Sequence, residues 1–238
     1  MNCSQLIRSL APMLILGVMI ALPLAPAPAN AGSISTPNLT PIYSQSSFLS
    51  PINRPITINW LTPGAPIVNP SLTIINTDAE LNTLFSLGPD NSLSRIVDVY
   101  FVDSILACGG PGTGIIGCAN TPGNDIVVRS SFAAGTQGAT LIAHELGHSL
   151  GLPHQASSLM SATISSNTTL HGTQVNAIFS NAGGFNLIQT GVGGNRFINL
   201  RPIAVIAVAV VPEPETYVLL LAGLGLIGLA TIRRRREV

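Results

Sequence analysis

Lysine is absent from this chain of 238 residues, and charged residues of all kinds make up only 8% of it. The ten Arg and ten acidic residues cancel formally, and four of the Arg lie together in the terminal run Arg233 to Arg236. No basic patch remains that could neutralise a phosphate backbone, so we exclude a nucleic-acid partner. The surface between the two ends must be built from Ser, Thr, Asn and Gly, which suits an extracellular protein.

The N-terminal segment, residues 1–31, has the three parts of a secretory signal peptide. Arg8 precedes an apolar run over 10–24, and Ala29-Asn30-Ala31 places small residues at the two positions that a signal peptidase reads. An N-terminal membrane anchor is the alternative, which two prolines near the ends of the run disfavour. We expect cleavage to leave Gly32 as the first residue of the exported protein.

Cysteine is scarce, since the chain has only three. Cys3 leaves with the signal peptide, so Cys108 and Cys118 remain. An even number in an oxidising compartment predicts one disulfide, which would stabilise the fold by about 2.5 to 3 kcal/mol. A two-thiolate metal site is the alternative, and it is less favoured because three histidines further along the chain already form a complete ligand set.

The C-terminal segment contains an apolar run over 216–232 that ends directly at the Arg cluster. At about 1.5 Å per residue this run extends roughly 25 Å, which is just enough for a transmembrane helix across a hydrocarbon core of about 30 Å. The positive-inside rule places the Arg cluster in the cytoplasm.

Immediately before this run stand Pro212, Glu213 and Pro214. The order of Pro-Glu-Pro, a short apolar span and an Arg cluster resembles the PEP-CTERM sorting signal of Gram-negative bacteria. The resemblance implies export across the inner membrane and temporary attachment by the C-terminal helix. It also implies cleavage near Pro-Glu-Pro by an exosortase-type sorting enzyme, followed by release or surface attachment. A plain C-terminal anchor is the alternative, but such an anchor has no need of Pro-Glu-Pro.

The rest of the chain predicts an α+β fold, because strand patterns come first and helix patterns follow. We expect a loosely ordered lead-in over 32–55, a main domain over 56–195, a late strand or a stalk over 196–211, and the sorting signal over 212–238. Strands are predicted at 56–61, 72–76, 96–105, 115–119 and 126–129, and helices at 78–87, 136–150 and 172–180.

The chemistry is concentrated in residues 144–154, which read His-Glu-Leu-Gly-His-Ser-Leu-Gly-Leu-Pro-His. On a helix, His144 and His148 lie one turn apart on the same face, so both imidazoles can bind one ion. Gly151 can adopt a positive φ and end the helix, which lets the chain return His154 as a third ligand.

Three imidazoles leave the fourth position of a tetrahedral zinc site open, as in catalytic zinc sites. Glu145 lies about 100° round the helix from the ligand face, beside the ion but not bound to it. A carboxylate in that place can act as general base toward a zinc-activated water that attacks a peptide carbonyl.

These eleven residues resemble the zinc signature of the metzincin peptidases, especially its matrixin-like form. The resemblance implies a zincin domain with a twisted sheet, an active-site helix, a C-terminal helix and an edge strand that aligns the substrate, for which 115–119 is the candidate. It also implies a Met turn beneath the zinc, with Met160 in Ser-Leu-Met-Ser. Some metzincins have a tyrosine ligand two residues later, where this chain has Ala162.

Two functions are therefore compared. The first is an exported zinc-dependent endopeptidase that acts on protein or peptide substrates. The second is a non-catalytic surface or matrix protein with a structural zinc site. Glu145 favours the first, because a structural site has no use for an unliganded base beside the metal.

Overall fold

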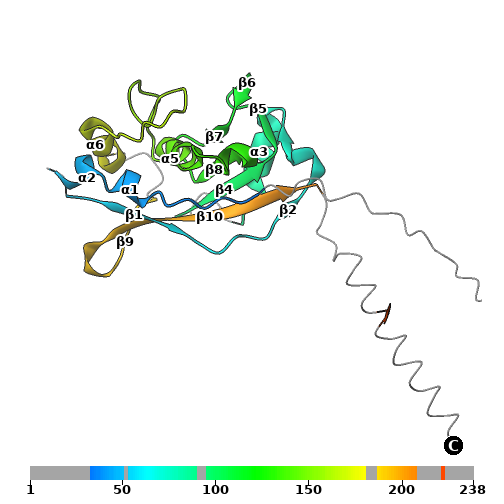
Figure 1. Ribbon diagram of the computed structural model, residues 1–238, viewed down its shortest axis with the longest axis horizontal. Coiled ribbons are helices and arrows are strands. Elements are labelled where there is room, and N and C mark those ends of the chain that lie inside the picture. Colours follow the sequence, from blue (N-terminus) through cyan, green and yellow to red (C-terminus); the bar gives the residue numbers. More distant parts are fainter. Residues whose placement is uncertain (1–32, 51–52, 90–94, 181–186, 208–220, 223–238) are drawn as a thin grey trace, which may run out of the picture.

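Five strands form the main path of the larger sheet, and β10 lies between strands that precede it by a hundred residues or more (Figure 1). Strand β7 is antiparallel to β8, and the other neighbours on this path are parallel. Two short strands, β2 and β9, also pair with β10. In sheet order the five are β1 (Ile56–Trp60), β10 (Arg196–Ile206), β4 (Ile96–Val102), β8 (Asp125–Arg129) and β7 (Gly117–Ala119).

The structure, a computed structural model, describes residues 33–50, 53–89, 95–180, 187–207 and 221–222. Its mixture of sheets and helices confirms the α+β class. The remaining strands are β2 (Ile67–Val68), β3 (Ile74–Ile75), β5 (Ser104–Ala107), β6 (Pro111–Ile115) and β9 (Gln189–Thr190), of which β3, β5 and β6 form a second sheet. The helices are α1 (Thr40–Tyr43), α2 (Ser46–Leu49), α3 (Asp78–Ser86), α4 (Ser130–Ala133), α5 (Gly138–Ser149) and α6 (Gly172–Ser180), with short 3₁₀ turns η1 (Pro70–Leu72) and η2 (Val192–Gly194).

The larger sheet is covered on both faces, and β4 shows how. Its side chains alternate, so that Val97, Val99 and Phe101 join the core beneath α5, whereas Tyr100 and Val102 join a second core with α3. The strand is therefore apolar on both sides, as expected for a central parallel strand. Helix α3 begins at the expected place, because Thr77 and Glu80 form a reciprocal capping box.

We expected residues 196–211 to form either a late strand or a stalk. Residues 196–206 form strand β10. The sheet thus continues past residue 195, where we expected the main domain to end. Leu200 packs into the core under α5, and Ile203 into the core on the α3 side. The fully buried Asp98 of β4 accepts two hydrogen bonds from the guanidinium of Arg201, at 2.8 and 3.1 Å. An apolar run that alternates between two covered faces is stable only inside the sheet.

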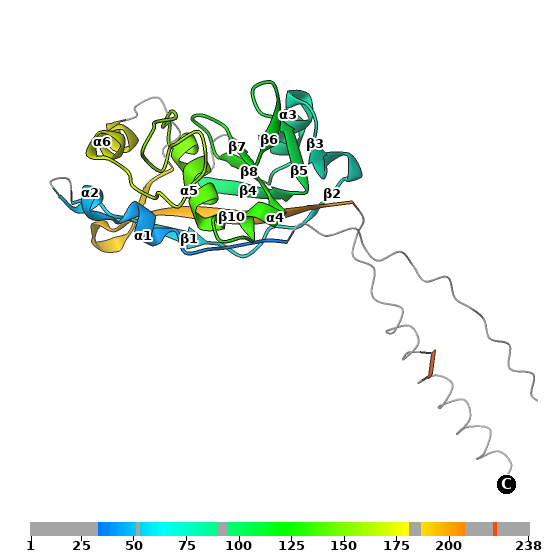
Figure 2. The ribbon, with the colours of Figure 1, turned by 45° about the horizontal axis from the view of Figure 1, so that its top comes forward.

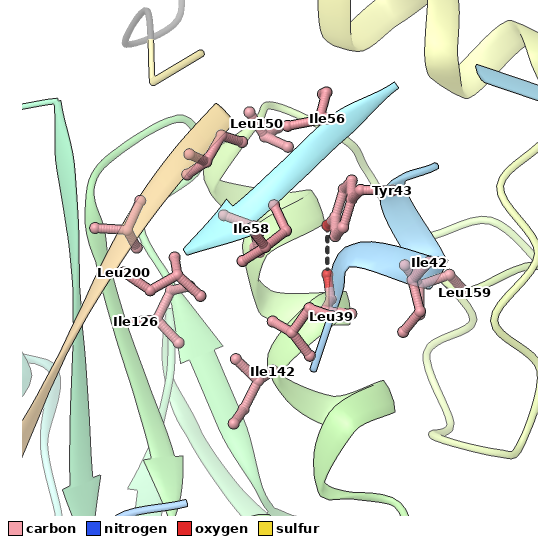
Figure 3. Close-up of a cluster of buried hydrophobic side chains, with 14 of the residues drawn as sticks. Leu39, Ile42, Tyr43, Ile56, Ile58, Ile126, Ile142, Leu150, Leu159 and Leu200 are labelled. Atoms are coloured by element: carbon pink, nitrogen blue, oxygen red, sulfur yellow. Dashed lines mark hydrogen bonds between the residues drawn. The ribbon is translucent and has the colours of Figure 1, made fainter. Parts of the chain in front are cut away.

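The lead-in over 32–55 differs from the expectation of loose order. Leu39, Tyr43 and Phe48 are fully buried, and the Tyr43 hydroxyl donates a hydrogen bond of 2.7 Å to the carbonyl of Ala143 in α5 (Figure 3). The polar composition of this segment hid the few large apolar residues that anchor it. Since Ala143 directly precedes His144, the lead-in helps to fix the helix that carries the histidine motif.

Two predicted strands are each divided. The run over 96–105 breaks at the exposed Asp103, where the chain leaves the larger sheet and enters the second one as β5. The run over 115–119 breaks at Ile116, between β6 and β7. In both cases a continuous apolar pattern concealed a change of sheet.

Within the described ranges, none of the helices has the length and apolar character needed to cross a bilayer. The predicted span over 216–232 falls outside these ranges except for Leu221 and Ala222, and the predicted signal peptide falls outside them entirely.

We predict that a fragment of residues 33–195 does not fold, whereas residues 33–207 do. The missing strand contributes five buried aliphatic side chains, Ile198, Leu200, Ile203, Val205 and Ile206. Even at about 2 kcal/mol each they contribute about 10 kcal/mol, comparable to the whole stability of a typical domain. Fluorescence of Trp60 and near-UV circular dichroism during urea titration would measure this. A cooperative transition in the shorter fragment would contradict the prediction.

Candidate metal centre and cleft

Helix α5 ends in a complete Schellman motif. Gly151 has φ of 85°, as predicted, and its N–H donates to the carbonyl of His148 at 2.8 Å. The N–H of Leu152 donates to the carbonyl of Gly147 at 2.9 Å. This cap reverses the chain directly after the helix, and the reversal brings His154 back beside the helical histidines.

The three predicted ligands converge. One ring nitrogen from each of His144, His148 and His154 lies within 4.8 Å of the others, and the Nε2 atoms of His148 and His154 are 3.2 Å apart. Two nitrogens bound to one tetrahedral zinc at about 2.1 Å would lie about 3.4 Å apart, so this pair fits zinc without rearrangement. Three neutral imidazoles are also a donor set that zinc prefers.

Backbone carbonyls orient the two helical histidines. The Nδ1 atom of His144 lies 2.8 Å from the carbonyl oxygen of Leu159, and that of His148 lies 2.7 Å from the carbonyl oxygen of Leu152. A carbonyl oxygen can only accept, so each Nδ1 must carry the proton. Each Nε2 is therefore left with a lone pair directed at the common site, which is the tautomer that metal binding requires.

Burial keeps these rings neutral. Loss of solvation lowers the pKa of His144, and it lowers that of His148 to about 4, with further depression from the neighbouring histidines. Neutral imidazole is the form that binds metal, so near neutral pH no proton competes with an ion for the nitrogens of these two residues.

Glu145 lies in the wall of the same cleft as the histidines, and the side chain is only 5% exposed. Burial raises the pKa of its carboxyl group to about 8 in the metal-free chain. A divalent cation held by the neighbouring histidines would favour the charged carboxylate and oppose this shift. Burial and the charge of a bound cation would therefore act in opposite directions on the protonation of Glu145.

Met160 is buried beneath the motif. A Cβ atom on Gly147 would overlap its sulfur and come within 3.0 Å of its Cε, so the thioether lies directly against the helix backbone. The turn is closed by a hydrogen bond of 2.7 Å from the N–H of Gln155 to the carbonyl of Met160. The buried Ser158 hydroxyl accepts from the N–H of Met160 and from the side chain of Gln174 in α6.

A cleft of about 750 Å³ opens beside the histidines. Strand β7 and the β6 segment form part of its wall. Figure 2 shows α5 lying between α6 and the strands β7 and β8. Apart from Glu145 and the three histidines, the cleft is lined by small, apolar or uncharged polar residues, which include Thr113, Ile115, Phe132, Gln137, Thr163 and Ile164.

The structure pairs Cys108 with Cys118, as predicted, with their Cα atoms 5.9 Å apart. Cys108 directly follows β5 and Cys118 is the central residue of β7, so the bond links the two sheets beside the cleft. Pro212, Glu213 and Pro214 lie outside the described residues.

Several groups that shape the histidine site were not predicted from the sequence. The carbonyls of Leu152 and Leu159 orient ligands through backbone atoms, which leave no mark on residue type. Gly147 and Gly117 stand where another residue's side chain packs against the backbone. A glycine in a helix or strand is the only available signal of such close approach.

We predict that the purified protein binds about one zinc per chain, and that replacing His144, His148 or His154 with Ala abolishes retention after dialysis. Loss of one of three ligands leaves too few donors for a stable site. Metal content by inductively coupled plasma mass spectrometry measures the effect. His171→Ala is the matched control, since this fourth histidine is not part of the cluster. Full retention by His154→Ala would contradict the assignment.

Comparison with known proteins identifies one segment. Residues 210–236 match the PEP-CTERM protein-sorting motif. No curated protein and no solved structure matches the chain, so the resemblance of residues 144–154 to metzincins has no support beyond the motif and its geometry. The sorting motif implies recognition by an exosortase-type enzyme. It indicates a secreted protein of Gram-negative bacteria that is sorted to the cell envelope.

Proposed function

We propose that this protein is an exported zinc-dependent endopeptidase. One observation carries the proposal: a buried, unliganded carboxylate, Glu145, stands beside three converging imidazoles in the wall of an open cleft. Three protein ligands leave a position for water or substrate, which is the arrangement of catalytic and not of structural zinc.

In this proposal the histidines bind the metal and Glu145 transfers the proton. His144, His148 and His154 would hold zinc, which supplies a Lewis acid that polarises the scissile carbonyl and lowers the pKa of water. Glu145 accepts the proton of the attacking water and then donates it to the leaving amine. A cation held by the histidines would favour the charged form of this carboxyl group, which is the form that can accept a proton.

Strand β7 offers a way to hold the substrate backbone. It is the last strand on the main path of the larger sheet, so it has β8 on one side and the cleft on the other. An extended peptide can add to such an edge by main-chain hydrogen bonds. This binding mode places the peptide beside Glu145 and requires no particular side chains.

The cleft favours uncharged substrate segments. Among the described residues that line it there is no Arg, and Glu145 is the one acidic residue, so a charged substrate side chain would lose its hydration without gaining a partner. Thr113, Gln137 and Thr163 supply hydrogen-bonding groups, and Ile115, Phe132 and Ile164 supply apolar surface. We therefore propose substrates whose residues around the scissile bond are apolar or uncharged polar.

A non-catalytic surface protein with a structural zinc site is the alternative. It explains the export signal and the three histidines equally well. It gives no reason for a buried carboxyl group in the wall of the cleft beside the three histidines. Catalysis supplies that reason.

We predict that Glu145→Gln keeps the zinc and the melting temperature nearly unchanged, and that it lowers kcat by about 10² to 10⁴. Gln has the same shape as Glu but cannot accept the proton of the attacking water. Peptide hydrolysis, zinc content and differential scanning calorimetry would be measured on the same preparation.

Gln137→Glu is a useful comparison for that variant, because it adds a carboxylate to the cleft without touching the base. It should change substrate preference toward basic residues while hydrolysis persists. A Glu145→Gln protein that cleaves at the parent rate would refute the mechanism. A parent protein that binds zinc but cleaves nothing in a broad peptide library would favour the structural alternative.

The sorting motif generates a separate prediction. If an exosortase-type enzyme cleaves near Pro212 to Pro214, the envelope-associated or released protein should lack Arg233 to Arg236. Intact-mass measurement of that fraction tests this, and the same measurement locates the N-terminus, expected at Gly32. Detection of the Arg cluster in the surface fraction would indicate a retained anchor instead.

A further inference from the structure

The carboxyl group of Glu145 is positioned by packing. The side chain is 5% exposed, and within the described part of the chain no hydrogen bond to its carboxylate is present. A Glu side chain has three rotatable bonds and many rotamers, so without hydrogen bonds its orientation depends on the atoms packed against it. A general base must nevertheless lie within hydrogen-bond reach of the water that it deprotonates.

Gly117 packs closely against this side chain. A Cβ atom added to Gly117 would lie 2.8 Å from both Cγ and Cδ of Glu145, and it would overlap Oε1. The backbone of β7 therefore lies along three successive atoms of the side chain. Only glycine permits this approach, since real Cβ atoms do not come so close to other heavy atoms. The strand backbone forms one wall of the space that holds the base.

Strand β7, which provides this backbone, is short and is the last strand in the order of the larger sheet. Strand β7 has only three residues, with Gly117 opposite Val128 and Cys118 opposite Val127 of β8. Side chains alternate along a strand, so Gly117 faces Glu145 while Cys118 joins the core on the α3 side. There the disulfide ties Cys118 to Cys108, which directly follows β5 of the second sheet. The bond thus ties β7 to the second sheet through the residue that directly follows Gly117.

We propose that Gly117 is a positioning residue for Glu145, and that the Cys108–Cys118 disulfide holds Gly117 in place for that role. The inference rests on the proposed peptidase function. A methyl group at position 117 pushes the carboxylate out toward the cleft, because the atoms in its way belong to a side chain and not to backbone. Loss of the disulfide has the opposite effect, since it lets β7 move away and gives the side chain additional rotamers.

The first test is Gly117→Ala in the mature protein. We expect kcat to fall about 10- to 100-fold, since a displacement of about 1 Å at a reacting group has an effect of that size. KM, zinc content and melting temperature should change little, because neither the ligands nor the core is altered. Gly172→Ala is the matched control, since its Cβ would meet no atom within 4 Å and it lies outside the cleft.

The second test removes the disulfide with Cys108→Ala and Cys118→Ala together. Amide hydrogen exchange across residues 117–119 should become faster, and kcat should fall while zinc is retained. In this background Gly117→Ala should lower kcat by a smaller factor than in the parent, because a strand without the disulfide can shift to make room for the methyl group. In a Glu145→Gln background Gly117→Ala should have almost no further effect, since it acts through the base.

The outcomes separate this inference from the proposed function. A parent protein without peptidase activity refutes the function. A parent with activity and a Gly117→Ala variant with unchanged kcat refute the positioning role. Loss of zinc or of the folded state in Gly117→Ala also refutes it and shows a purely structural role. Additive effects of Gly117→Ala and the disulfide variant, with unchanged exchange in β7, refute the part assigned to the disulfide.

Discussion

The Nδ1–H groups of His144 and His148 donate to carbonyl oxygens that lie beyond the end of their own helix. These two hydrogen bonds fix the tautomer, the ring planes and the direction of both Nε2 lone pairs. They also make the site depend on the loop that follows α5. The loop must return past Leu152 and Leu159 in one conformation, and the Schellman cap at Gly151 and the contact between Gly147 and Met160 keep it there. The orientation of the two imidazole rings therefore depends on the conformation of the loop that follows α5.

The sequence was informative wherever function depends on side-chain type and local spacing. The interval between His144 and His148 fixes a helical face, and Gly151 signals a helix end, so both were predictable from local geometry. The capping box of α3 was predictable for the same reason.

The sequence was uninformative where a residue acts through its backbone or through a distant partner. Tyr43 reaches Ala143 across a hundred positions, and nothing near Tyr43 predicts that contact. Strand β10 could not be distinguished from a stalk, since an apolar run has the same composition in either setting. Its place between β1 and β4 is decided by the full set of tertiary contacts, which local propensity does not encode.

The central position of β10 has a consequence for when the domain can finish folding. Ile56 pairs with Arg196, so the sheet closes only after nearly the whole domain has been made. A chain is synthesised from its N-terminus, and pairings between residues so distant in sequence form slowly. The histidine motif therefore leaves the ribosome before the strand that completes the sheet behind it. The sorting motif begins at residue 210, four residues after β10 ends at Ile206. The strand that completes the sheet and the sorting motif are therefore close together in the sequence. The domain therefore cannot complete its larger sheet until the residues directly before the sorting motif have been made.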